Sequence, residues 1–144
     1  MLTEIFLGAF LLICSFTDIK SREVKPVILI IFGVIATVSY IVFRPVGLFE
    51  EAAGIITGLC FVGLYFITEE KIGLGDGLLM TVTGIFLGGR QNAFLIMTAM
   101  LLSAVFSIVL LMIKRADRKT GFAFVPFVFA SYLIRMVISA GRLL

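Results

Sequence analysis

The sequence predicts an all-α integral membrane protein with about six transmembrane helices, and three observations support this fold class. Of its 144 residues, 61% are hydrophobic and only 15% are charged, whereas soluble chains average about 45–50% and about 25%. The mean hydropathy is +1.21. The apolar residues form continuous blocks, and not the alternating segments of about ten residues that a transmembrane β-barrel requires.

The length of the chain limits its architecture. A spanning helix needs roughly 17–25 residues, so 144 residues hold at most about six helices joined by short loops. No linker or low-complexity tract interrupts the apolar blocks. We therefore expect a single integral-membrane domain over residues 1–144, with no room for a second domain.

The first three helices are expected over residues 2–17, 26–43 and 52–68. The first block ends at Asp18 and lacks the basic start and small-residue cleavage site of a secretory signal, so it is expected to be a retained helix. Pro26 suits the first turn of the second helix, and Arg44-Pro45 ends that helix. Glu50 and Glu51 are expected to precede the third.

The fourth helix is the shortest. Its clean apolar run, residues 78–88, spans only about 16 Å, roughly half of a bilayer core. A start near Ile72 lengthens the helix to about 26 Å and places Asp76 about one turn inside it. The sequence therefore predicts that Asp76 is a buried carboxyl and not a loop residue. The fifth and sixth helices are expected over residues 93–113 and 122–140, on either side of a basic loop.

The distribution of basic residues predicts the orientation in the membrane, because cytoplasmic loops carry an excess of Lys and Arg. Of the 12 basic residues, eight fall in the connections after the first, third and fifth helices, and four belong to the other side. Both termini are then expected outside the cytoplasm, with Asp18 and Asp76 on the cytoplasmic side. The eight are Lys20, Arg22, Lys25, Lys71, Lys114, Arg115, Arg118 and Lys119, against Arg44, Arg90, Arg135 and Arg142.

Asp18 and Asp76 are candidate functional residues, because an ionisable group at a membrane helix is costly. Alternatives exist for each: Asp18 as a solvated interfacial charge, and Asp76 as a helix N-cap that bonds free amides. Two carboxyls at equal depth favour a dyad. Ionising both carboxyls of such a pair is unfavourable because two negative charges would lie close together, so the pair titrates as a unit. One carboxylate can then activate a water molecule to attack a peptide carbonyl.

Other chemistries have weaker support in the sequence. The chain has no histidine and two cysteines, and Cys14 and Cys60 form no CxxC pair, so a structural zinc site is excluded within it. Serine catalysis would need a lysine beside Ser21, and nothing singles out such a pair. Nucleotide-binding glycine motifs are missing. We expect no metal, no cofactor and no nucleic-acid partner.

Glycines surround Asp76 and recur in two helices. Gly73, Gly75 and Gly77 remove side chains and permit close backbone approach, so a substrate strand could lie against Asp76; a flexible helix start is the simpler alternative. Two GxxxG pairs in the third and fourth helices indicate close helix packing. These pairs are Gly54 with Gly58 and Gly84 with Gly88.

Three segments, at residues 70–76, 18–22 and 123–127, together resemble the type IV prepilin peptidase family, a group of GxGD intramembrane aspartyl proteases. Residues 70–76, Glu-Lys-Ile-Gly-Leu-Gly-Asp, resemble the family's E-x-x-G-x-G-D motif. Residues 18–22 resemble its other aspartate segment, and residues 123–127 its late P-F-x-P-F segment. The matches occur in the family's order and cover essentially the whole chain. Three departures are Leu78 in place of a lysine, Val24-Lys25-Pro26 in place of Ile-Pro-Asn, and Ala123 in place of the first proline.

This resemblance implies a function and a site. It implies removal of the short basic leader from prepilin-like proteins, after a glycine, at the cytoplasmic face of a prokaryotic cell membrane. Asp18 and Asp76 would be the catalytic pair, and Glu70 a supporting residue beside the glycines. The partners implied are prepilin-like substrates and membrane lipids. The cysteine-bearing segment that larger members use in N-methylation is missing, so methylation is not expected.

Other functions remain open at this stage. A preflagellin-type peptidase would use the same chemistry, and presenilin-like GxGD proteases share the Gly-Leu-Gly-Asp string but are larger. A small proton- or cation-coupled transporter could use the same aspartates, although its site is expected near mid-membrane. A non-catalytic membrane assembly subunit is the remaining class. The oligomeric state is not predicted.

Overall fold

The structure, a computed structural model, describes residues 2–21, 24–43, 47–68, 73–113 and 123–141, and the described residues form six helices and no strand. The predicted all-α fold class is confirmed. In chain order the helices are α1 (Leu2–Ser21), α2 (Pro26–Phe43), α3 (Leu48–Ile67), α4 (Leu74–Leu87), α5 (Gly89–Met112) and α6 (Val125–Gly141).

Three of the helices, α2, α3 and α5, are long and apolar enough to cross a membrane by length and composition. Helix α4 and most of α6 are shorter apolar helices. Large hydrophobic side chains face outward, among them Ile30 on α2 and Leu101 on α5. An apolar exterior of this extent suits lipid and not water, which agrees with a membrane protein.

Several helix boundaries differ from the sequence-based expectation. Helix α1 continues past Thr17 to Ser21, so Asp18 lies inside its last turn. Helix α3 begins at Leu48 and includes Glu50 and Glu51 in its first turn, where carboxylates are favoured by the helix dipole. The Glu50 carboxylate also accepts a 3.1 Å hydrogen bond from the Arg90 backbone amide in the first turn of α5.

The last three helices also start at other residues than expected. Helix α4 begins at Leu74, so Asp76 lies in the helix, as predicted, but in its first turn and only half-buried; the expected start at Ile72 lies outside the described residues. Helix α5 begins at Gly89 because Gly88, with φ of 76°, turns the chain sharply after α4. Only glycine adopts this conformation freely. Helix α6 begins at Val125.

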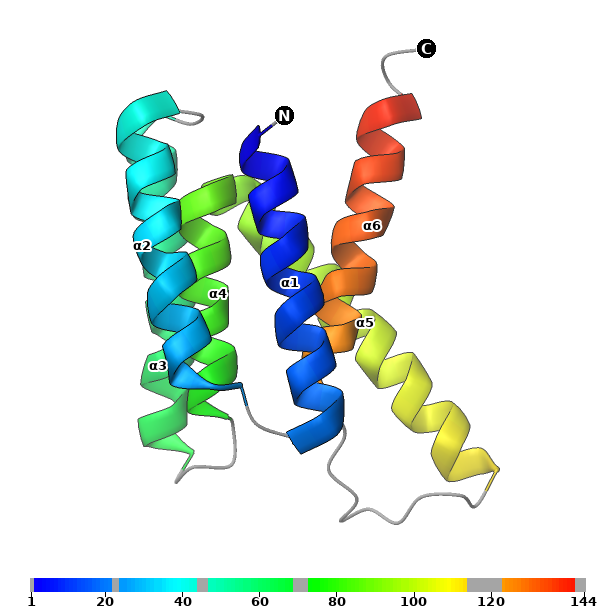
Figure 1. Ribbon diagram of the computed structural model, residues 1–144. Helices are drawn as coiled ribbons and strands as arrows, with labels where there is room; N and C mark the ends of the chain where they lie inside the picture. Colours follow the sequence, from blue (N-terminus) through cyan, green and yellow to red (C-terminus); the bar gives the residue numbers. More distant parts are fainter. Residues whose placement is uncertain (1, 22–23, 44–46, 69–72, 114–122, 142–144) are drawn as a thin grey trace.

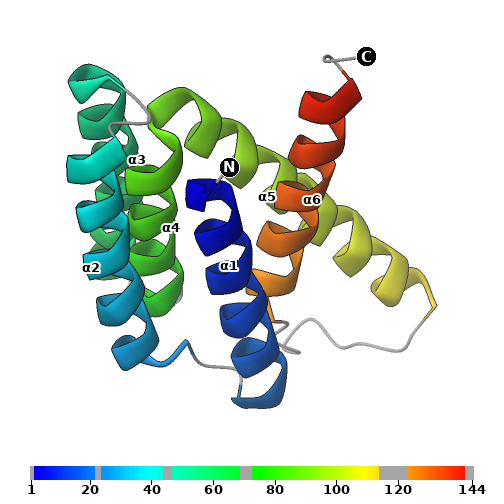
Figure 2. The same ribbon diagram turned by 45° about the horizontal axis from the view of Figure 1, so that its top comes forward.

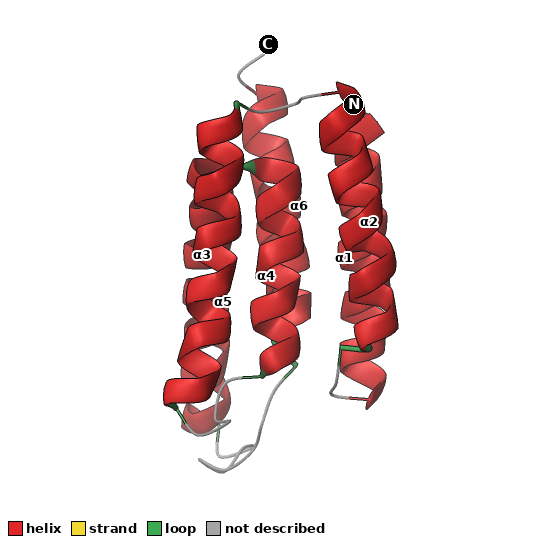
Figure 3. Cartoon of the chain, turned by 90° about the vertical axis from the view of Figure 1, so that its left-hand side faces the viewer, coloured by secondary structure: helices red, strands yellow, loops and turns green. Residues whose placement is uncertain are grey.

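The helices run up and down, with both chain ends at one end of the bundle (Figure 1; Figure 3). Helices α2, α3 and α4 lie together, α1 stands between α4 and α6, and α5 crosses obliquely from α4 toward α6 (Figure 2). Helix α1 packs mainly on α6 and makes few contacts with α2 and α4. The last turn of α1 and the first turns of α4 and α6 lie toward the end opposite the termini (Figure 1).

Glycines bring α3 and α4 into backbone contact, as the GxxxG pattern predicted. A Cβ atom added at Gly54 would collide with the backbone of Gly84, and one added at Gly58 would collide with Thr81. Gly88 lies against Gly54 at the end of α4. Side chains at these glycines would force the helices apart, so the glycines fix the depth and rotation of the helix that carries Asp76.

A buried polar pair joins α4 to α5. The hydroxyl of Thr83 donates a 2.8 Å hydrogen bond to the side-chain oxygen of Asn92, whose amide nitrogen donates to the Met80 carbonyl at 3.0 Å. Both side chains are fully buried. Because every partner is satisfied, this pair fixes the register of α4 against α5.

Candidate active site

Asp18 is buried, with 5% of its surface exposed, in the last turn of α1. Its Oδ2 atom accepts a 2.9 Å hydrogen bond from the backbone amide of Val125, the first residue of α6. The backbone of Phe124 adds a second favourable interaction with the same carboxyl. Asp18 is therefore held by the amino end of another helix, and the interpretation as a solvated interfacial charge is wrong.

Asp76 is half-buried in the first turn of α4. The N-cap position belongs to Gly73, whose backbone is extended, and the Asp76 amide donates a 3.1 Å hydrogen bond to the Gly73 carbonyl. Asp76 is thus not the N-cap residue, and its side chain is not needed to close the start of the helix. Its carboxylate still benefits from the positive end of the helix dipole.

The structure brings the two predicted aspartates to the same end of the bundle. Helices α1 and α4 contact each other, Asp18 lies in the last turn of α1 and Asp76 in the first turn of α4, and the negative charge of Asp18 disfavours ionisation of Asp76. The two aspartates lie in different helices, far apart in the sequence, and the fold brings both toward the same end of the bundle (Figure 1).

Three glycines around Asp76 have different neighbours. A Cβ atom at Gly73 would lie 3.2 Å from Oδ2 of Asp76, and one at Gly75 would lie 3.2 Å from the side chain of Val24. Gly77 faces α3, where an added Cβ would come within 2.9 Å of the Val62 backbone nitrogen. Gly77 therefore serves helix packing, while Gly73 leaves space beside the carboxyl itself.

Glu70, the predicted supporting residue, lies outside the described residues, as does Glu69. In the described part of the chain, no three His, Cys, Asp or Glu side chains come close enough to hold a metal ion. Cys14 is buried one turn before Asp18, and Cys60 is exposed on α3.

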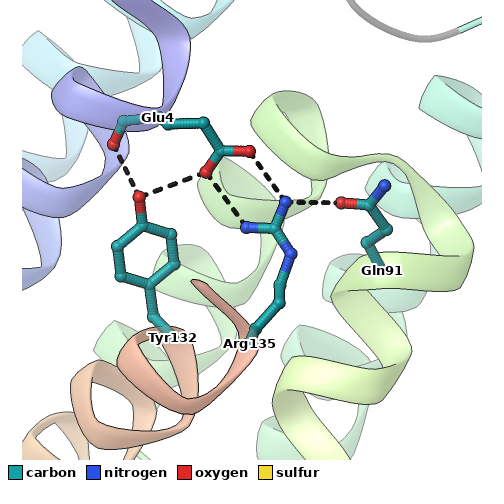
Figure 4. Close-up of polar contacts among 4 residues, drawn as sticks. All are labelled: Glu4, Gln91, Tyr132 and Arg135. Atoms are coloured by element: carbon teal, nitrogen blue, oxygen red, sulfur yellow. Dashed lines mark hydrogen bonds and ion pairs between the residues drawn. The ribbon is translucent and has the colours of Figure 1, made fainter. Parts of the chain in front are cut away.

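A second polar cluster, which sequence reasoning missed, lies at the opposite end of α1 (Figure 4). Glu4 accepts two hydrogen bonds from the Arg135 guanidinium, at 2.8 and 3.0 Å, and Tyr132 donates to the Glu4 carbonyl at 2.7 Å. Arg135 also donates to Gln91 of α5. The signal was the presence of one acidic and one basic residue in otherwise apolar helices, a pattern that favours pairing.

The described residues form a small helical protein with three helices long and apolar enough to cross a membrane and with two aspartates toward one end of the bundle. The family model of the type IV leader peptidase family matches residues 5–112, and the chain belongs to this family. The match begins within α1, includes both aspartates, and ends at the last residue of α5, before α6. The chain matches no curated protein and no solved structure at a significant level. It is a peptidase of the leader peptidase type.

Proposed function

We propose that this protein is an intramembrane aspartyl endopeptidase that removes the short basic leader of prepilin-like proteins, after a glycine, at the cytoplasmic face of the cell membrane. Membership of the type IV leader peptidase family implies prepilin-like substrates. The observation that supports the aspartyl mechanism is that Asp18 and Asp76 lie toward the same end of the bundle, in terminal turns of two helices that contact each other (Figure 1). Among the described residues, Asp18 and Asp76 are the acidic residues that lie in the two aspartate segments identified in the sequence.

The proposed chemistry follows from two carboxyls that share one proton. The ionised carboxylate takes a proton from a water molecule, whose oxygen attacks the carbonyl carbon of the scissile peptide bond. The protonated carboxyl donates a hydrogen bond to the carbonyl oxygen as negative charge develops there. When the C–N bond breaks, a proton passes to the leaving nitrogen, and the products are a free leader and a mature hydrophobic segment.

Positive charge near the dyad supports the cytoplasmic assignment. Lys20 and Lys25 are exposed on either side of the connection between α1 and α2, at the same end as Asp18. An excess of basic residues on one side is typical of the cytoplasmic face. A basic leader could then remain in the cytoplasm while its hydrophobic stem lies in the bilayer.

Two rival functions differ in what they need from this site. A preflagellin-type peptidase would cut a related leader by the same chemistry, so only the substrate distinguishes it. A proton- or cation-coupled transporter needs ionisable groups near mid-membrane. The position of Asp18 and Asp76 in terminal turns of their helices, one held by the start of α6, favours the peptidase.

The proposal is tested by incubating the purified protein, in lipid vesicles, with a synthetic substrate that contains a basic leader, a glycine and a hydrophobic helix. Mass spectrometry then reports the products. We expect a single cut after the glycine. A substrate in which leucine replaces that glycine, and another in which alanines replace the basic residues, serve as matched controls.

The outcomes separate the classes of function. A cut at another position would contradict the proposed specificity while leaving the peptidase activity in place. Absence of any product, together with proton or cation uptake into the vesicles, would instead favour the transporter.

A further inference from the structure

The main chain at the start of α6 is directed at Asp18. The Val125 amide is 2.9 Å from the Asp18 carboxylate and both residues are buried. Pro126, the next residue, has no amide hydrogen. The amides of Phe127 and Val128 both donate to the Phe124 carbonyl, at 3.0 and 3.4 Å. Within α6 the amide of Val125 is the one directed at Asp18, and the backbone of Phe124, just before the helix, also interacts with this carboxyl.

This hydrogen bond matters because α1 has few other contacts that fix Asp18 relative to Asp76. Helix α1 packs mainly on α6, whereas its contacts with α4 are few. At the far end of the same two helices, Glu4 binds Tyr132 and Arg135 (Figure 4). Helix α6 therefore holds α1 at both ends, and the geometry of the aspartate pair depends on α6.

We propose that Val125 is a positioning residue that holds the Asp18 carboxylate for catalysis through its main-chain amide. The amide donates to the Oδ2 atom of Asp18 and so fixes the orientation of the carboxylate. This inference rests on the proposed aspartyl peptidase function. It assigns a role in the reaction to α6, which lies beyond the residues 5–112 that the family match covers.

The first experiment replaces Val125 by proline, which deletes the amide hydrogen but is tolerated in the first turn of a helix. Val125→Ala keeps the amide and removes most of the buried side chain, so it measures the effect of lost packing. Leu48→Pro makes the same change at the first residue of α3, where the preceding Gly47 is already extended, as a residue before proline must be.

The readout is kcat and KM for cleavage of the synthetic leader substrate. We expect Val125→Pro to lower kcat roughly tenfold or more relative to Val125→Ala, because a hydrogen bond to a charged group is lost. KM should stay within about twofold, since substrate binding is not affected, and Leu48→Pro should retain the wild-type kcat. Equal kcat values for the proline and alanine variants, in a wild-type protein that cleaves, would overturn the inference.

A second measurement does not depend on activity. Thermal unfolding in detergent is compared for Val125→Pro, Asp18→Ala and the double variant. If the amide binds Asp18, the effect of Val125→Pro should be smaller in the Asp18→Ala background, a coupling that a double-mutant cycle reports. Strict additivity would contradict the contact. If Val125→Pro does not fold, the α-hydroxy acid analogue of valine at 125 replaces the amide N–H by oxygen, keeps the side chain and takes its place in both experiments.

The two measurements separate the two claims. Wild-type protein that shows coupling but never cleaves would contradict the peptidase proposal and leave the contact in place. Cleavage by the wild type, without coupling and without a loss of kcat in Val125→Pro, would contradict only the role of Val125.

Discussion

The hydroxyl of Tyr132 donates a 2.7 Å hydrogen bond to the main-chain carbonyl of Glu4, and this bond joins α6 to the first turn of α1. Tyr132 is almost fully buried, and the same hydroxyl lies 3.1 Å from the Glu4 carboxylate. The Arg135 guanidinium completes the cluster (Figure 4). The far end of α1 from Asp18 is therefore fixed by main-chain and side-chain contacts together.

Tyr132→Phe should destabilise the protein by about 0.5–1.5 kcal/mol, because the ring remains but the hydrogen bond is lost. Thermal unfolding in detergent measures the change. If Tyr132→Phe has no effect on unfolding, the hydroxyl contributes nothing to the attachment of α1.

The effects of Arg135→Gln and Glu4→Gln on the free energy of unfolding should be non-additive when the two are combined, since each removes the same ion pair.

Gly54→Ala should prevent α3 from packing on α4, because the new methyl group would collide with the backbone of Gly84. Gly63→Ala, in the same helix, is the matched control, since nothing lies within 4 Å of a Cβ atom there. The control should be neutral or stabilising by up to about 1 kcal/mol, as alanine is the better helix former. Yield and thermal stability of the purified variants report the difference. Similar behaviour of both variants would contradict the close contact between the helices.

Reporter fusions test the predicted orientation. A fusion after residue 144 should be active only with a reporter that works outside the cytoplasm, because the three connections on the side of Asp18 and Asp76 contain eight of the 12 basic residues. Reversing the charge difference between the two sides should reduce this bias. Activity of a cytoplasmic reporter at the carboxyl terminus would contradict the cytoplasmic placement of the dyad.

Cysteine and metal chemistry should be dispensable. Cys14→Ala and Cys60→Ala should each retain most of the cleavage activity, with Cys14→Ala costing some stability because that side chain is buried. Chelators should leave the rate unchanged. The rate of leader cleavage with and without EDTA is the measurement, and a loss that added zinc restores would contradict the aspartyl mechanism.

The sequence predicted the fold class because six apolar blocks and their polar interruptions are local signals. It also predicted that Asp18 and Asp76 lie at one end, since helices of similar length alternate in direction. It did not predict the helix starts at Leu48 and Gly89: the first turns of α3 and α5 contact each other, and α5 also follows the sharp turn at Gly88. Glu50, for example, accepts a hydrogen bond from the Arg90 amide at the start of α5.

The environment of each aspartate was less predictable than its position. The Val125 amide reaches Asp18 from 107 residues away, and no local pattern indicates a main-chain donor at that distance. Glu4 and Arg135 likewise lie far apart in the sequence, and their pairing depends on how the helices pack. The late segment at residues 123–127 was notable in the sequence only as a resemblance, whereas in the structure it holds a carboxyl in place.

The central claim is that Asp18 and Asp76 act as one catalytic unit, and single and double substitutions by asparagine test it most directly. Asparagine keeps the size and polarity of the side chain but removes the titrating carboxyl. The rate of leader cleavage should fall by roughly a thousandfold or more in Asp18→Asn and in Asp76→Asn. The double variant should be no worse, because groups that act together are strongly non-additive. Near-normal cleavage by either single variant, with folding intact, would contradict the dyad.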